Sequence, residues 1–289
     1  MRRRARRTTS RAQTPRGDCI PVMQHVPRKR FGQHFLADER VIAQIVRAIE
    51  PQSDDLLVEI GPGLGALTAP LAARLNQLHV VELDRDIVAR LRSDYPEDKL
   101  VMHAGDALAF DFSALGSGLR VVGNLPYNIS TPILFHLMRH IAAIRDVHVM
   151  LQKEVVARIV ARPGTPEYGR LSVMLQHHFD VKKILDVTAA AFRPRPKVES
   201  AVVRMSPREP TNQCSCDEAV FGEVARAAFS QRRKTLRNAL RAYLQADDFA
   251  VLGIAPAARA QELRVDDFVR IANHLVARRA AHAQEPRPH

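Results

Sequence analysis

The chain has 289 residues, of which 46% are hydrophobic and 26% charged, so we expect one large soluble domain with an appendage. No run of about 18 apolar residues occurs, which argues against a membrane span, and no apolar segment follows the N-terminal arginines as in a secretory signal. The net charge is +12, of which residues 1–30 carry +9. This charge favours a polyanionic partner such as a nucleic acid.

Residues 1–27 form a basic stretch that we expect to be a disordered extension, although a transit peptide or an RNA-binding arm fits the same composition. The cysteines, Cys19, Cys214 and Cys216, are odd in number and suggest a reduced, cytoplasmic protein. Cys214 and Cys216 lack a neighbouring Cys/His set with zinc spacing, so we expect no metal.

Apolar spacing predicts a helix over 38–50, with Asp38 as its cap and Pro51 after its end. Solidly apolar strands then alternate with turns and helices, over 56–75, 78–95, 99–112, 119–141 and 147–161. This order predicts an α/β fold with a doubly wound, mostly parallel sheet that is covered on both faces.

The pattern changes after Arg162. A loop over 162–170 leads into a helix over 170–178, and two strands follow near 181–188 and 199–205. Later segments are helical only, near 217–229, 231–245 and 266–279. We therefore expect a domain over 28–208, a small C-terminal all-helical domain over 209–280, and a tail over 281–289.

Two features of the first strands point to a nucleoside-containing cofactor. Gly61 and Gly63 lie in a glycine turn between a strand and a helix, where the backbone can approach a ligand. Glu82 lies 21 residues after Gly61, at the end of the next strand, where its carboxylate can accept both hydroxyls of a ribose. Of the nearby acids, we expect Asp86 to cap the following helix.

The acid beside the glycine turn selects among such cofactors. Glu59 would repel a pyrophosphate, whereas it suits the sulfonium and amino groups of S-adenosylmethionine. Asp106, at the end of the third strand, either hydrogen-bonds an adenine amino group or caps the next helix.

The segment Asn124-Leu-Pro-Tyr127 follows the fourth strand, beside the switch point where such sheets bind ligands. The exocyclic amine of adenine is a poor nucleophile because its lone pair is delocalised. The Asn124 amide oxygen and the Leu125 carbonyl would draw this nitrogen toward tetrahedral geometry, and Tyr127 offers a face for the base. The plainer interpretation is a turn at a strand end with a core tyrosine.

The chain resembles the KsgA (RsmA) family of small-subunit ribosomal RNA adenine dimethyltransferases, which have a Rossmann-like class I methyltransferase fold. The resemblance is carried, in order, by RKRFGQHFL, VEIGPGLGALT, VELDRD, GNLPYNIS, MLQKEV, YGRLSV, FRPRPKVESAVV and FSQRRKTLRN. A single glycine loop is unspecific, whereas the ordered set from about 28 to 278 is highly specific.

The resemblance implies roles for individual residues. His34 and Leu36 would contact the methyl donor, S-adenosylmethionine; Gly61 would lie under its methionine part, Glu82 would hold the ribose and Asp106 the adenine. Asn124 would lie near donor and acceptor, while Tyr127 and Phe192 would enclose the target base. Many members have Asn at the position of His34, and we expect cofactor binding to survive this change.

The same resemblance implies a substrate: two adjacent adenosines in a hairpin near the 3′ end of 16S rRNA, within a small-subunit precursor, with two methyl groups added to each. The protein would work as a monomer, without metal or membrane.

The expected RNA contacts are two groups of cations. Arg193, Arg195 and Lys197 follow Phe192, which on the residues alone suits a hydrophobic plug under a loop. Arg232, Arg233, Lys234 and Arg237 open the second predicted helix of the small domain, and such a cluster without acids favours rRNA over a merely solvated face. Two alternatives remain: a methylase of another rRNA site, and an rRNA-binding assembly factor without catalysis.

Overall fold

The computed structural model describes residues 34–209, 216–231 and 233–284. The basic extension over 1–27, Cys19, Cys214 and Arg232 lie outside the described residues.

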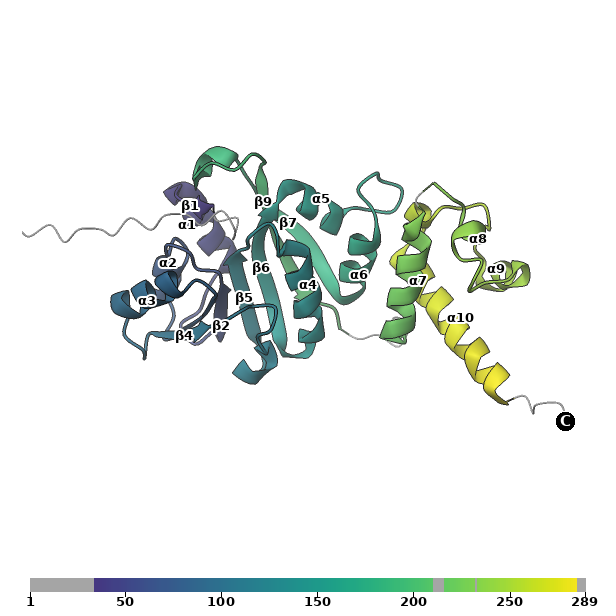
Figure 1. The fold of residues 1–289 in the computed structure, drawn as a ribbon, viewed down its shortest axis with the longest axis horizontal. Helices are drawn as coiled ribbons and strands as arrows, with labels where there is room; N and C mark the ends of the chain where they lie inside the picture. Colours follow the sequence, from purple (N-terminus) through teal and green to yellow (C-terminus); the bar gives the residue numbers. More distant parts are fainter. Residues whose placement is uncertain (1–33, 210–215, 232, 285–289) are drawn as a thin grey trace, which may run out of the picture.

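The core of the fold is a seven-stranded sheet with the order β4-β3-β2-β5-β6-β9-β7 (Figure 1). Six strands run parallel, and only β9 runs antiparallel to its neighbours. The prediction of a mostly parallel α/β sheet is thus confirmed. The strands are β2 (Leu57–Ile60), β3 (Leu78–Glu82), β4 (Leu100–Ala104), β5 (Leu119–Asn124), β6 (Ile144–Gln152), β7 (Phe179–Val187) and β9 (Ser200–Pro207).

Helices cover both faces of this sheet, because its strands are apolar on both sides. One face packs against α1 (Glu39–Ile49), α2 (Thr68–Ala72) and α3 (Arg85–Asp94). The other packs against α4 (Ser130–Arg139), α5 (Lys153–Val160) and the end of α6 (Arg170–His178). Short 3-10 helices occur at Phe112–Leu115, Ile141–Ala143, Ala189–Ala191 and Ala260–Glu262.

Of the two capping residues predicted from the sequence, one is confirmed and one is wrong. The Asp38 side chain accepts the N–H groups of Arg40 and Val41 and so caps α1 as predicted. The expectation that Asp86 caps α3 was wrong. Asp84 is the cap and accepts the Asp86 N–H, because the strand ends at Glu82 and leaves room for an extended residue before the helix.

The C-terminal part is helical, as predicted, with α7 (Glu218–Ser230), α8 (Leu236–Ala239), α9 (Ala246–Leu252) and α10 (Val265–Gln284). Their apolar core also includes Tyr168 and Met174, so it continues onto α6. The predicted long helix over 231–245 was wrong. Only the short α8 forms within it, and Thr235 at its start has an extended backbone.

A small two-stranded sheet joins segments that are far apart in sequence. Strand β1 (Phe35–Leu36) pairs antiparallel with β8 (Phe192–Arg193), and the Ala37 N–H donates to the Ala191 carbonyl just beyond the pair. Both strands are too short to produce a sequence pattern. They bring the segment before α1 against the chain that precedes β9.

Within the described residues, every helix is too short or too polar to cross a lipid bilayer.

Candidate functional site

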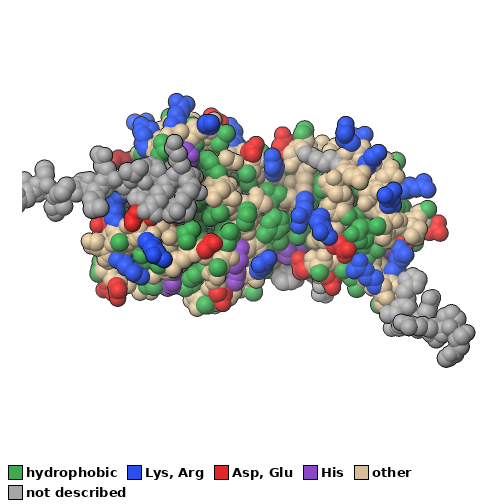
Figure 2. Space-filling model, viewed as in Figure 1, with side chains coloured by type: hydrophobic (Ala, Val, Ile, Leu, Met, Phe, Trp, Pro, Cys, Tyr) green, Lys and Arg blue, Asp and Glu red, His purple; other side chains and the backbone are tan. Residues whose placement is uncertain are grey.

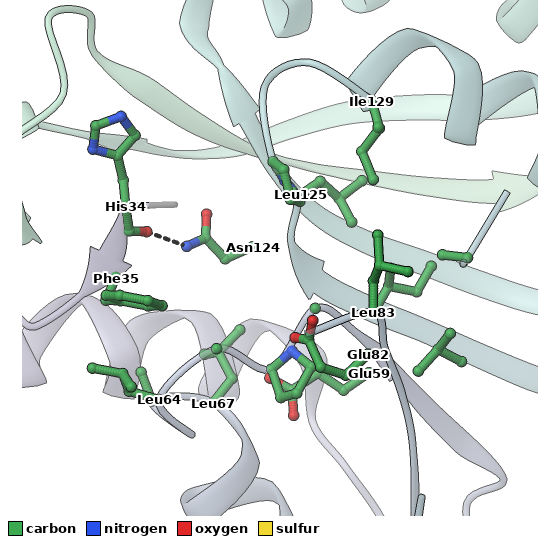
Figure 3. Close-up of a pocket in the computed structure, with 18 of the residues that line it drawn as sticks. His34, Phe35, Glu59, Leu64, Leu67, Glu82, Leu83, Asn124, Leu125 and Ile129 are labelled. Atoms are coloured by element: carbon green, nitrogen blue, oxygen red, sulfur yellow. Dashed lines mark hydrogen bonds between the residues drawn. The ribbon is translucent and has the colours of Figure 1, made fainter. Parts of the chain in front are cut away.

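A pocket lies at the carboxyl ends of β2, β3 and β5, where the strand order reverses between β2 and β5 (Figure 3). Connections after these strands form its walls, and the segment 34–36 closes one side. All the residues predicted to contact a cofactor line this pocket: His34, Leu36, Gly61, Gly63, Glu82, Asp106 and Asn124.

The glycine turn forms part of the pocket wall with a backbone that other residues rarely adopt. Gly61 has φ +65° and Gly63 has φ +56°. A Cβ atom at Gly63 would lie 2.9 Å from the Phe35 ring, so this ring packs directly on the turn. The turn therefore needs glycine both for its conformation and for the close approach of segment 34–36.

Two buried carboxyl groups lie beside the turn. Glu59 is 1% exposed and accepts a 2.7 Å hydrogen bond from Thr68 Oγ1, while Glu82 accepts the Asp84 N–H. Burial, with a smaller contribution from the charge of Glu82, raises the pKa of Glu59 to about 7. Burial also raises the pKa of Glu82, opposed mainly by the Asp84 N–H. Both acids would be stabilised as anions by a bound cation, which is the fit that a sulfonium ligand requires.

Asp106 lines the pocket and also makes a local contact. Its Oδ1 accepts the Leu108 N–H at 2.9 Å, in the manner of a cap, and the residue is exposed. Because a carboxylate has two oxygens, this contact leaves one oxygen for a ligand. The two interpretations of Asp106 are therefore compatible.

Asn124 is held in one orientation by the segment across the pocket. Its Nδ2 donates a 3.0 Å hydrogen bond to the main-chain carbonyl of His34 (Figure 3). The amide nitrogen is thereby engaged, and the Oδ1 oxygen is left as an acceptor. The preceding Gly123 admits no side chain, since a Cβ atom there would lie 2.5 Å from the Ile60 carbonyl oxygen.

Tyr127 has an aromatic neighbour, His34. Its ring stacks on that of His34 with centroids 5.6 Å apart, and its hydroxyl lies 2.8 Å from Ser200 Oγ. Phe192, the other ring expected to enclose the target base, lies apart from this stack. Phe192 is 0% exposed, belongs to the apolar core beneath β8, and is not part of the pocket wall. The strand pair with Leu36 explains this, because it directs Phe192 into the core.

Sequence reasoning missed Phe35, Thr68 and Ser200 as site residues. Phe35 packs on Gly63, Thr68 donates to Glu59, and Ser200 contacts Tyr127. The position of Thr68, nine residues after Glu59, is the only local signal among these. The other two contacts depend on β1 pairing with β8 and on β9 lying beside β6.

The predicted RNA-contacting cations lie on two separated segments. Arg193, Arg195 and Lys197 are exposed, although Arg193 donates to the Ala190 and Phe192 carbonyls. Arg233, Lys234 and Arg237 are exposed too. None of these six forms an ion pair with another described residue. Figure 2 shows Lys and Arg side chains along the upper margin of the molecule, at both ends.

The arrangement of the second group differs from the prediction. Arg233 and Lys234 precede α8 and are not within a helix, and only Arg237 lies on it. Phe229, at the end of α7, lines a groove with Lys153, Arg158 and Arg170, which the sequence did not single out. Glu199 neutralises Lys153 through a 2.6 Å ion pair.

Comparisons with known proteins identify the family. Residues 24–277 match the family model described as ribosomal RNA adenine dimethylase. The chain is 59% identical over 254 residues to "Ribosomal RNA small subunit methyltransferase A" of Thiobacillus denitrificans, covering 88% of this chain and 100% of that protein. It is 57% identical to the protein of the same name from Chromobacterium violaceum, covering 88% and 97%.

Solved structures share the fold. A dimethyladenosine transferase from Plasmodium falciparum superposes with a TM-score of 0.71 at 24% identity, covering 82% of this chain and 96% of that one. The 23S rRNA methyltransferase ErmE superposes with a TM-score of 0.64 at 24% identity, covering 84% and 99%.

Proposed function

Since the chain belongs to the ribosomal RNA adenine dimethylase family, we propose that it methylates 16S rRNA with S-adenosylmethionine as methyl donor. It is an rRNA adenine dimethyltransferase, and it adds two methyl groups to the exocyclic amine of each of two adjacent adenosines in a hairpin near the 3′ end. Support comes from the relatives, which are small-subunit methyltransferases by name and are matched over 97% or more of their length.

The observation that carries the chemistry is the fixed amide of Asn124. The bond from Nδ2 to the His34 carbonyl leaves Oδ1 as an acceptor for the amine N–H of the target base. A second N–H would be accepted by the Leu125 carbonyl. Two acceptors placed in this way favour a pyramidal nitrogen with its lone pair directed at the methyl carbon. Catalysis would come mainly from positioning and exclusion of water.

The remaining pocket residues would bind the methyl donor. Glu82 would accept the ribose hydroxyls, Asp106 would accept from the adenine, and Gly61 and Gly63 would allow close approach of the methionine part. S-adenosylmethionine supplies an activated methyl group on sulfur, so the transfer itself requires no metal.

The target base would stack on Tyr127. His34 already stacks on this ring, so the base either extends that stack or displaces the imidazole. Phe192 would take part only if it left the core, and it is not included in this proposal.

We propose that the natural partner is a small-subunit precursor, contacted by Arg193, Arg195, Lys197, Arg232, Arg233, Lys234 and Arg237. Because one chain carries all the groups required at the pocket, it would act as a monomer, in the cytoplasm where subunits assemble.

The test is transfer of labelled methyl groups to immature small subunits, followed by mapping of dimethyladenosine. We expect label at two adjacent adenosines near the 3′ end. Label at another rRNA site would support a different methylase, and tight subunit binding without label would support the assembly-factor alternative.

The matched variant for this test is Asn124→Ala. It should lower transfer by about a hundredfold or more, as removal of one catalytic hydrogen-bonding group does in other enzymes, while cofactor binding falls much less. Undiminished dimethyladenosine from this variant would refute the acceptor role of Asn124.

A further inference from the structure

A cluster of metal-ligating side chains lies outside the pocket, where the α/β part meets the C-terminal helices. His177 and His178 are the last two residues of α6, and Cys216 and Glu218 lie at the start of α7. Ligand atoms of His177, His178 and Glu218 lie within 4.8 Å of one another. The Cys216 Sγ lies 3.7 Å from His177 Nε2.

Three separations between these atoms are close to those between neighbouring ligands of one metal ion. The His177 Nε2 atom is 3.4 Å from Glu218 Oε1, and His178 Nε2 is 3.1 Å from Glu218 Oε2. Metal–ligand bonds of about 2.0–2.3 Å at tetrahedral angles place neighbouring ligand atoms roughly 3.3–3.8 Å apart. Two of these three separations, 3.7 Å and 3.4 Å, fall in this range, and the 3.1 Å contact of His178 is slightly shorter.

The chemistry of the four groups suits zinc. Two imidazoles, one thiolate and one carboxylate are all zinc ligands, and the two anionic groups would balance the charge of the ion. The cluster lies partly at the surface: His177 is 9% exposed and its ring packs on Phe221 with centroids 4.2 Å apart, whereas the Glu218 side chain is 57% exposed.

The second imidazole lies beside the same carboxylate. His178 Nε2 is shielded from solvent and is 3.1 Å from Glu218 Oε2, without a hydrogen bond of ideal geometry. The Nε2 atoms of both histidines therefore converge on Glu218, and a metal ion bound between these groups would replace the present contacts.

We propose that Cys216, His177, His178 and Glu218 form a zinc site that fastens α7 to the end of α6. The connection from β9 to α7 begins at Arg208, whose N–H donates to the His178 carbonyl. Zinc at this point would join both ends of the connection and fix the helical part relative to the sheet. The site is separate from the cofactor pocket, so its role is structural.

The experiment uses the full chain, reduced, stripped with a chelator and returned to chelator-free buffer. Titration with Co²⁺ should give the visible absorption of a tetrahedral site together with thiolate-to-metal charge transfer. One equivalent of Zn²⁺ should abolish both signals and raise the melting temperature. Metal analysis of protein prepared without chelator should show about one zinc per chain.

Variants locate the site. Cys216→Ser should remove the charge-transfer band, and His178→Gln or Glu218→Gln should weaken Zn²⁺ binding by more than about tenfold, because loss of a ligand costs at least as much as loss of a supporting contact. Glu223→Gln, on the same helix, is the control and should bind as the wild type does. Circular dichroism of each metal-free variant reports whether it folds.

Absence of stoichiometric Co²⁺ or Zn²⁺ binding by the folded, reduced chain would overturn the proposal, and the cluster would then be a set of ionic contacts to Glu218. Binding that survives Cys216→Ser and His178→Gln together would place the metal elsewhere and would overturn it equally.

Discussion

At the residue scale, Glu59 is an acid whose burial opposes its own ionisation until a cation binds. Its pKa in the folded chain is about 7, against 4.5 for an unperturbed glutamate. The pKa of Glu59 is higher in the folded than in the unfolded chain. Its contribution to the free energy of unfolding is therefore fully present below about pH 4.5 and is lost as the pH rises through 7. A bound cationic ligand would stabilise the Glu59 carboxylate and so oppose this loss of stability at high pH.

We therefore predict that Glu59→Gln raises the melting temperature of the ligand-free protein at pH 8 but not at pH 4. The same variant should bind S-adenosylmethionine several-fold more weakly, with a smaller change for the uncharged sulfide product. Calorimetry of unfolding and of both ligands checks this. Glu97→Gln, an exposed acid, is the control. An equal loss for both ligands would argue that Glu59 does not sense the sulfonium.

His34 contributes to the site mainly through its backbone. The carbonyl, not the imidazole, accepts from Asn124, whereas the ring contacts Tyr127 and lies 2.9 Å from the Pro194 carbonyl through Nδ1. We predict that His34→Asn keeps methyl transfer within about threefold of wild type, because the backbone bond survives. A loss as large as that of Asn124→Ala, in steady-state assays, would mean that the imidazole itself positions substrate.

At the element scale, Arg120 on β5 ties two strands and the end of α1 together. It contacts Asp146 on β6 at 3.0 Å and Asp55 at 2.6 Å, with all three side chains 5% exposed. Burial alone would raise the pKa of Asp146, but contacts with His148 and Arg120 lower it to about 2. Because the folded-state pKa is depressed below 3.8, the stabilisation is present above about pH 4 and lost as the pH falls through 2.

We predict that Asp146→Asn destabilises the fold by about 3–5 kcal/mol at neutral pH, since it leaves a buried guanidinium without one partner. It should also flatten the dependence of stability on pH between 4 and 2. Urea unfolding at a series of pH values measures both. If the free energy of unfolding falls equally steeply between pH 4 and 2 in the variant and the wild type, Asp146 does not titrate in this range.

The sequence predicts elements well where a local signal defines them. The helix over 170–178 and the capped α1 agree with the structure because apolar spacing and a capping carboxylate are local properties. The region 231–245 contains strong helix formers, but distant backbone groups override this preference. The Leu236 N–H donates to the Ala258 carbonyl, and the Arg237 N–H to that of Pro256.

The same distinction applies to the site. The glycine turn follows β2, and Glu82 and Asn124 are the last residues of β3 and β5, so a parallel sheet necessarily brings all three to one edge. The burial of Phe192 fits a hydrophobic plug, the interpretation that the residues alone favour, but its surroundings depend on a two-residue strand pair with Leu36 that no sequence pattern shows. The His177–Cys216 contact spans 39 residues and likewise leaves no sequence spacing to detect.

At the scale of the whole molecule, the two groups of cations proposed to contact RNA lie at two places and would bind it independently. One group begins at Arg193 in β8 and continues in the segment after it, and the other lies just before and on α8. Figure 1 shows that the C-terminal helices lie at the opposite end of the molecule from α3. Each group should release counterions separately.

We predict that changing Arg193, Arg195 and Lys197 to Gln lowers the salt slope of subunit binding by up to about 2, and that changing Arg233, Lys234 and Arg237 does the same. The two effects should add. Arg90 and Arg92 on α3 serve as the control pair. Filter binding over a range of salt concentrations measures the slopes, and an unchanged slope in either triple variant would remove that group from the interface.

The pairing of β1 with β8 has a kinetic consequence. The backbone that covers the donor pocket continues, through a single strand pair, into the loop with Arg193, Arg195 and Lys197. If this loop contacts the RNA as we propose, exchange of the used methyl donor between successive transfers would disturb that contact. We expect the enzyme to act distributively, with partly modified intermediates released along the way.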